Sequence, residues 1–458
     1  MTHNQCITVQ HKKKSIELTI HRMAMFHAIK VIEAYDENHN CYLLYFYKNQ
    51  YLTYKKTPSI SLISRLQMIF TKGIMIHAPH PLIHEQVGNT RYAPFYSFNQ
   101  LLPKLESQYT QQETAFIFSF FDNYISKEKL VALFKKHYNQ FRRDGQFFKA
   151  YQLLRTCLDF APENTWAQDM SHNLQYHSYE KLYDAAGASL LSKDPLFAEI
   201  QLFQNRQDRD SFIQLQDKLS TDSRWVDQIG LYIDQVNTAN QQTFLSLLSS
   251  HLSEEATAKV LRELLKKEHL PLVQDTLFNI LLNLRQYEEA INTMAIPHAK
   301  LSDSQFLQIQ DIFENQELDS NKLHTQNFNQ ILVHQTDSRK LEKMLRLCVP
   351  LLFQKHEFSY IDEWLEPLRE RQLSLPTLQK INLMKELKDD PERQLLLGEL
   401  YYEFKQYELA IDCFSFDMEL RPTSAEPIQW LAKSYRDMGK LEEATSYQNV
   451  LSMMQKRA

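Results

Sequence analysis

Glycine is scarce in this chain of 458 residues, which contains only 7. Average usage is about 7%, and glycine supplies the positive φ angles that tight turns require. Its scarcity argues against a turn-rich β-sandwich and against an enzyme built on a glycine-rich phosphate loop. A mainly helical chain is the simplest account of this composition.

Cysteines and long apolar runs are also few. The five cysteines stand singly at positions 6, 41, 157, 348 and 413, without a Cys-x-x-Cys, so neither a disulfide framework nor a cysteine-rich zinc site is expected. No run approaches the roughly 18 apolar residues of a membrane span. Lysines 12, 13 and 14 precede the first apolar block, unlike a secretory signal. We expect a cytoplasmic protein that does not associate with membranes.

The net charge of −5 is unevenly distributed along the chain. Residues 1–110 hold 12 Lys and Arg against 6 Asp and Glu, which gives +6, so the remainder carries 39 against 50, which gives −11. A basic segment of this kind attracts acidic partners, including nucleic acid, but it can equally attract the acidic part of its own chain.

The C-terminal region repeats a pattern of small, aromatic and proline residues every 34 positions. Counted from Pro391, the pattern places Leu397, Gly398, Tyr401, Ala410, Phe414 and Pro422 at positions 7, 8, 11, 20, 24 and 32. The next 34 residues place Leu431, Ala432, Tyr435 and Ala444 at positions 7, 8, 11 and 20. Small residues let two antiparallel helices approach, aromatic side chains fill the gaps beside them, and the proline ends the second helix.

This pattern resembles the tetratricopeptide repeat (TPR) family, most clearly over residues 391–455. Two earlier segments share part of it: Ala150 and Pro162 hold positions 20 and 32 counted from Val131, and Ala290 holds position 20 counted from Pro271. The resemblance implies a solenoid of helical hairpins whose first helices line a concave groove that binds peptides or helices of other proteins.

Lys135 and Asn139 stand at positions 5 and 9 of the unit that begins at Val131. TPR domains similar to those of chaperone co-factors use such a pair to bind the carboxylates of a partner's C-terminus. The alternative is a solvated helix face, and Glu399 at position 9 of the later repeat would repel a carboxylate.

The N-terminal region has a different pattern. Aromatic and β-favouring residues over 42–47 and 51–54, separated by polar turns, predict a three-stranded antiparallel meander within 28–56, preceded by a strand near 16–21. Residues 61–70 read as a helix, with Leu62, Leu66 and Phe70 on one face. Glycines and prolines make 73–96 loop-rich. We expect a small α+β domain over 1–110, degenerate helical hairpins over 115–390 and two C-terminal repeats over 391–458.

Two polar clusters in the N-terminal region have alternative readings. His77, His80 and His84 are candidate ligands of a transition metal, but the prolines among them favour a plain polar loop. Tyr45, Tyr47, Tyr51 and Tyr54, with nearby lysines, could stack nucleic-acid bases, or they could form the faces of a packed sheet.

No catalytic motif stands out, and no cofactor is expected. There is no glycine-rich phosphate loop, no Gly-x-Ser-x-Gly and no His-Glu-x-x-His. The sequence therefore favours a non-enzymatic adaptor that binds a protein or peptide, with a nucleic-acid-associated regulator as the alternative. The last repeat is followed by only three residues, without the polar helix that often covers such a repeat. We expect this last helix to dock on the chain itself, on a second copy or on a partner.

Overall fold

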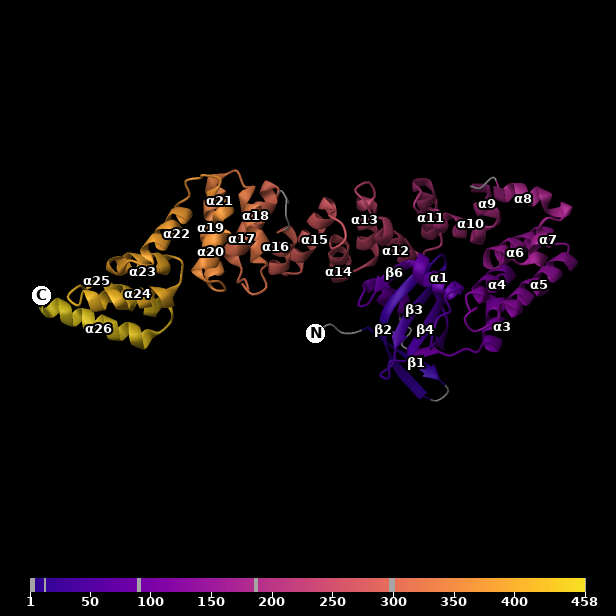
Figure 1. Cartoon of the computed structure of the whole chain (residues 1–458), viewed down its shortest axis with the longest axis horizontal. Helices are drawn as coiled ribbons and strands as arrows, with labels where there is room; N and C mark the ends of the chain where they lie inside the picture. Colours follow the sequence, from indigo (N-terminus) through magenta and orange to yellow (C-terminus); the bar gives the residue numbers. More distant parts are fainter. Residues whose placement is uncertain (1–4, 12–13, 89–91, 185–187, 296–300, 458) are drawn as a thin grey trace. The chain divides into compact units, whose positions relative to one another are not determined.

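The computed structural model describes residues 5–11, 14–88, 92–184, 188–295 and 301–457. It is mainly helical with a β-sheet near the N-terminus, as the sequence predicts (Figure 1). The chain forms two compact units, Met1–Val273 and Gln274–Ala458. The boundaries expected from the sequence, near residues 110 and 390, both fall inside these units.

The sheet of the first unit contains seven strands, of which six follow one another in the order β5-β4-β3-β2-β1-β7, while β6 pairs with β2. Strands β3, β4 and β5 form the predicted antiparallel meander. The strand expected near residues 16–21 lies within the long β2. The bounds are Cys6–His11 (β1), Lys14–Phe26 (β2), Ile29–Tyr35 (β3), Cys41–Tyr47 (β4), Gln50–Lys56 (β5), Ile74–His77 (β6) and Tyr92–Pro94 (β7).

The sheet is curled. Residues 92–96 pair with β1 and also form hydrogen bonds with β5, which lies at the opposite end of the strand order. Strand β7 pairs in parallel with β1, and the Tyr51 hydroxyl of β5 donates to the Pro94 carbonyl at 3.0 Å. The Thr53 hydroxyl donates to the Tyr96 carbonyl at 2.9 Å, and the Tyr96 N–H returns a bond to Thr53 at 3.1 Å. The segment around Tyr96 thus forms hydrogen bonds with the edge strand β5, as a neighbouring strand would.

Two short helices differ from the sequence predictions: one lies in the segment 73–96, which the sequence predicts to be loop-rich, and the other is the predicted helix 61–70, shifted along the chain. The segment 73–96 contains β6, β7 and α2 (Pro81–Val87), which begins with His80 as N-cap and Pro81 in the first turn. Helix α1 spans Arg65–Lys72, so it begins four residues later than predicted, and the Leu62 side chain lies outside it, 84% exposed.

Some of the other helices of the first unit pack against the sheet. Helix α12 contacts β6 and α2, beside the sheet in Figure 1, and Phe203 of α10 packs edge-on against Phe26 of β2. These helices are α3 (Phe98–Gln108), α4 (Gln111–Ser119), α5 (Lys127–Arg143), α6 (Phe147–Phe160), α7 (Thr165–Ser171), η1 (Leu174–Tyr176), α8 (His177–Asp184), α9 (Ala188–Lys193), α10 (Pro195–Gln204), α11 (Arg209–Thr221), α12 (Trp225–Gln235), α13 (Gln241–His251) and α14 (Glu254–Leu265). Helix α15 (Pro271–Asn283) begins at the end of the first unit.

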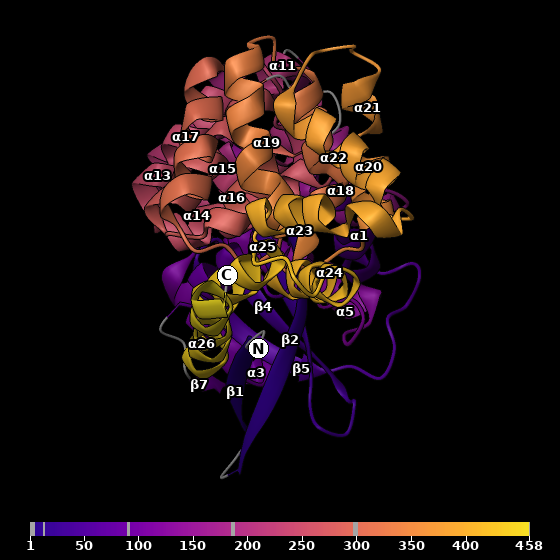
Figure 2. The ribbon, with the colours of Figure 1, turned by 90° about the vertical axis from the view of Figure 1, so that its left-hand side faces the viewer.

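The described part of the second unit is helical throughout. Its helices are α16 (Tyr287–Met294), α17 (Asp303–Asn315), α18 (Thr325–Val333), α19 (Ser338–Phe353), α20 (Phe358–Trp364), α21 (Glu366–Arg369), α22 (Pro376–Leu387), η2 (Pro391–Arg393), α23 (Gln394–Glu403), α24 (Tyr407–Leu420), α25 (Glu426–Asp437) and α26 (Leu441–Arg457). Each of α23, α24 and α25 packs against the next helix in the chain (Figures 1 and 2).

Candidate functional site

Most repeat-signature residues of the second unit lie where its last four helices pack together. A Cβ atom on Gly398 of α23 would lie 2.5 Å from the Phe414 ring of α24, which is too close for any side chain. Phe414 in turn stacks on Trp430 of α25, with ring centroids 5.6 Å apart. The other buried signature residues are Leu397, Tyr401, Ala410, Leu431, Ala432 and Ala444.

The remaining signature residues occupy mixed environments. Tyr435 is half-buried and stacks on Tyr447 of α26, with centroids 5.5 Å apart. Pro162 and Pro422 are exposed, each two residues beyond the end of a helix, α6 and α24 respectively. Ala150 of α6 and Ala290 of α16 are fully buried. The small positions thus lie at helix contacts and the prolines at helix ends.

Helices α23, α24 and α25 share a surface that we call the aromatic face. It is defined by Tyr402 of α23, Tyr407 at the start of α24, and Trp430 and Lys433 of α25. The three rings are half-buried, and that of Tyr402 packs edge-on against those of Tyr407 and Trp430, 5.4 and 5.2 Å away. The exposed Lys433 ammonium lies 4.7 Å from the Tyr402 ring centroid and 4.5 Å from that of Trp430. The Lys433 ammonium therefore makes cation–π contacts with both rings.

Carboxylates surround the aromatic face. Asp437 accepts a hydrogen bond from the Tyr402 hydroxyl. Burial and the neighbouring charge of Glu426 raise the pKa of Glu399, which also bonds Trp430. Glu403, one residue after Tyr402, pairs with Lys380 of α22. The face therefore combines aromatic rings with negative charge.

The first unit contains a separate cleft of about 660 Å³, which we call the polar cleft. It lies where the β4–β5 turn, the first turn of α4, the start of α10 and the end of α11 meet. The lining residues are Tyr47, Lys48, Tyr109, Thr110, Gln111, Gln112, Glu113, Phe141, Lys149, Gln152, Lys193, Pro195, Leu196, Glu199, Lys218 and Asp222. Its volume is in the range typical of small-molecule sites.

Every carboxylate in the lining of the polar cleft already has a cationic partner. Glu113 accepts from Lys48 at 3.1 Å and from the Tyr47 hydroxyl at 2.8 Å. Lys218 pairs with Asp222 at 2.9 Å. Glu199 is paired more deeply, with the Arg224 guanidinium at 2.6 Å. Lys149 and Lys193 are exposed at the same cleft, which leaves a surplus of positive charge.

A buried ionic network supports the floor of the polar cleft. Lys30 of β3, fully buried, donates to Asp227 at 2.8 Å, to Gln86 at 2.7 Å and to the Lys48 carbonyl at 2.7 Å. Arg224 bonds both Glu199 and Asp227. Burial lowers the pKa of Lys30, although Asp227 opposes that shift. Because each ammonium proton has an acceptor, this network fixes β3, α10 and α12 together.

A second buried network joins the two helix N-termini at the cleft. The Gln112 side-chain amide, in the first turn of α4, donates to Asp194, the N-cap of α10, at 3.1 Å. Asp194 also accepts from the Tyr183 hydroxyl at 2.5 Å and caps the Phe197 N–H at 3.1 Å. Burial raises the pKa of Asp194. The positive ends of α4 and α10 are therefore held close together.

The paired residues Lys135 and Asn139 lie on α5 but have different surroundings. The Lys135 ammonium lies 5.0 Å from the Trp166 ring centroid, while Asn139 is exposed. A carboxylate-binding role for this pair stays a prediction.

The three histidines of the candidate metal motif have separate positions. His80 is buried, and its Nδ1 accepts the Leu82 N–H at 3.1 Å, so it serves as the N-cap of α2. His77 and His84 are exposed. Among the described residues, no group of three His, Cys, Asp or Glu side chains is placed to hold a metal ion.

The tyrosines considered for base stacking are packed against other rings. Tyr45, Tyr47 and Tyr54 are buried, and Tyr51 is half-buried. Tyr45 lies 4.7 Å from Phe121 by ring centroids, and Tyr47 lies 5.1 Å from Tyr109. These side chains do not form an exposed stacking surface.

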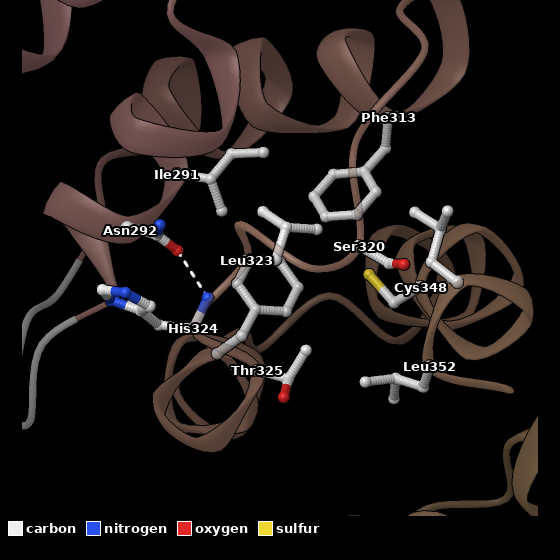
Figure 3. A pocket seen from close by; sticks show the side chains of 11 residues that line it. Ile291, Asn292, Phe313, Ser320, Leu323, His324, Thr325, Cys348 and Leu352 are labelled. Atoms are coloured by element: carbon white, nitrogen blue, oxygen red, sulfur yellow. Dashed lines mark hydrogen bonds between the residues drawn. The ribbon is translucent and has the colours of Figure 1, made fainter. Parts of the chain in front are cut away.

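The second unit also holds a small apolar pocket of about 20 Å³ (Figure 3). Ile291, Phe313, Leu323, Cys348 and Leu352 surround it, and on one side the Asn292 side-chain oxygen accepts the His324 N–H at 2.7 Å. Since one water needs about 10–15 Å³ of such space, this pocket is a packing gap and not a site for an organic ligand.

No protein-family model matches the chain, and no curated protein is significantly similar to it. In the part of the chain that the structure describes, no helix is both long enough and apolar enough to cross a membrane.

Proposed function

We propose that this chain is a cytoplasmic, non-enzymatic adaptor whose helices form tetratricopeptide-like hairpins and bind a partner protein. The observation that carries the proposal is the aromatic face, whose central rings, Tyr402 and Trp430, lie on α23 and α25. Half-buried tyrosine and tryptophan side chains are the types that contribute most to binding energy at protein interfaces. In a tetratricopeptide arrangement, these two helices would be the first helices of adjacent hairpins and would line the groove.

The charge around the aromatic face indicates the partner's chemistry. Residues 274–458 hold 21 Lys and Arg against 29 Asp and Glu, which gives −8. Glu399 and Glu426 lie close enough for the charge of one to raise the pKa of the other, and an incoming cation would relieve this repulsion. The favoured partner is therefore a protein segment with Lys or Arg, whose cation takes the place of Lys433 over the rings.

Affinity capture with the full chain from nuclease-treated native extract tests this proposal. We expect a protein partner to be retained, and the variant Tyr402→Ala/Trp430→Ala to retain it at least about tenfold less, because losing such aromatic anchors costs about 2 kcal/mol or more. Phe416→Ala, which truncates a 44% exposed aromatic side chain on α24, is the matched control. Circular dichroism checks that each variant is folded.

Lys433→Ala gives the sharper test of a cationic partner. This change frees both ring faces and makes the face more negative, so we expect it to increase capture of a basic segment. Equal capture by wild type and the Tyr402→Ala/Trp430→Ala variant would contradict the proposed role of the face. If nuclease abolished all capture, the alternative of a nucleic-acid-associated regulator would take precedence; self-association would show as capture of the chain itself.

A further inference from the structure

We propose that the polar cleft of the first unit binds a small organic phosphate of about nucleotide size. This proposal is independent of the adaptor function, because all residues that line the polar cleft lie between Tyr47 and Asp222, whereas the aromatic face lies in the second unit. No motif for it exists in the sequence. The lining residues come from segments far apart in the chain, and only the fold brings them together.

The charge of the polar cleft selects for an anion. Four lysines line it against three carboxylates, and these carboxylates are already paired. Behind Glu199, the Arg224 guanidinium bonds both Glu199 and Asp227 and so balances these buried carboxylates; the surplus positive charge comes from Lys149 and Lys193. The ammonium groups of Lys149 and Lys193 stand at the exposed side, where they can pair with phosphate oxygens.

The backbone of the polar cleft also favours an anion. Helices α4 and α10, of 9 and 10 residues, both begin in the lining. The Gln112–Asp194 bond holds the two N-termini together. In the first turn of α4, the backbone N–H groups of Gln111 and Gln112 precede the first intrahelical bond, which the Thr114 N–H makes to the Thr110 carbonyl at 2.9 Å.

Size and aromatic content extend the inference from an anion to an organic phosphate. A cleft of about 660 Å³ is much larger than one phosphate group requires. The half-buried rings of Tyr109 and Phe141 lie in the same lining, so a planar ring of the ligand can pack against them. Gln111 and Gln152 add neutral amide groups that can bond a sugar or a base.

Isothermal titration calorimetry on the full chain, with ATP, inorganic pyrophosphate and citrate as probes, tests this site. We expect saturable binding of ATP, weaker binding of pyrophosphate, and weaker binding of both at higher salt. The variant Lys149→Ala/Lys193→Ala should weaken ATP at least about tenfold, since one charge-assisted hydrogen bond contributes more than the 1.4 kcal/mol of a tenfold change. Both side chains are exposed, so the fold should persist.

The variant Lys129→Ala/Lys259→Ala is the matched control, because it removes two exposed lysines of the same unit that do not line the polar cleft. It should bind ATP as the wild type does. Absence of binding of all three probes at millimolar concentration would overturn the proposal, and so would equal weakening by both double variants. Citrate binding tighter than ATP would overturn the assignment to phosphates. Capture of a protein partner does not bear on these outcomes.

Discussion

Single residues in this protein have roles that their type alone does not reveal. Lys30 stands in an apolar strand and is fully buried, with three acceptors from three different segments. A lysine in a strand is normally read as a solvent-facing residue. Its partners Gln86 and Asp227 follow it by 56 and 197 residues, so no local pattern could have predicted the network. For the tyrosines of β4 and β5, the sequence left two alternatives open, base stacking and packing within the sheet. In the structure these side chains pack against other rings.

His80 shows how burial converts a candidate ligand into a structural cap, and it makes stability depend on pH. Its neutral imidazole accepts the Leu82 N–H, and burial, helped by Lys267, lowers its pKa to about 4. Unfolded, the side chain titrates near 6.5. Between these values the unfolded chain binds a proton that the folded chain does not. The free energy of unfolding should therefore fall by roughly 3 kcal/mol as the pH drops from about 6.5 to 4.

The variant His80→Asn isolates this effect. Asparagine can accept the same N–H as an N-cap but does not titrate. Urea unfolding at pH 7.5 and at pH 4.5, followed by circular dichroism, should show a loss of stability on acidification that is roughly 2–3 kcal/mol smaller in the variant than in wild type. Equal losses would mean that His80 is protonated in the folded protein. His27 and His137, whose pKa values burial also lowers, are unchanged and contribute equally to both proteins.

At the scale of elements, helices are the part of this structure that the sequence predicts best. In α23–α26 the small signature residues Gly398, Ala410, Ala432 and Ala444 are buried, and at Gly398 the close packing against Phe414 leaves no room for a larger side chain. Four elements were missed. Strands β6 and β7 depend on distant partners, because they pair with β2 and β1 respectively. Strand β1, which pairs with the adjacent β2, and helix α2, whose N-cap is a histidine, have partners close in sequence but carry weak local signals.

The contact between α23 and α24 gives a direct test of this packing. Gly398→Ala places a methyl group against the Phe414 ring, and we expect it to destabilise the second unit by about 1–3 kcal/mol, as overpacking does. The measurement is urea unfolding combined with hydrogen exchange of the α23 and α24 amides. Ser452→Ala, a change at an exposed position of α26, should stay within about 0.5 kcal/mol of wild type.

A second substitution makes the cause unambiguous. Because the clash is with one ring, Phe414→Leu should create room for the methyl group, so the double variant should lose less stability than the sum of the single variants. An additive double variant would show that Gly398 matters for another reason, such as backbone freedom within α23.

At the scale of the whole molecule, the two units differ in net charge. Residues 274–458 carry −8, so residues 1–273, with 30 Lys and Arg against 27 Asp and Glu, carry +3. From the sequence, the charge was divided at residue 110, with +6 before it and −11 after it, and neither part could be located on a surface. The polar cleft draws on segments from Tyr47 to Asp222, and its charge balance depends on which carboxylates already hold a cation. Such pairing is set by tertiary contacts and cannot be read from spacing.

The two proposed sites predict separate responses when ligands of opposite charge bind the same chain. ATP should increase the hydrogen-exchange protection of the Gln111 and Gln112 amides of α4 and of the Leu196 amide of α10, since these residues line the polar cleft. A synthetic peptide of alternating Arg and Leu should instead protect amides of α23 and α25, because it matches the negative charge around the aromatic face. The double variants at Lys149/Lys193 and at Tyr402/Trp430 should each abolish one response and leave the other intact. If either ligand protected both regions equally, or if one double variant removed both responses, charge would be acting non-specifically and the two sites could not be treated as independent.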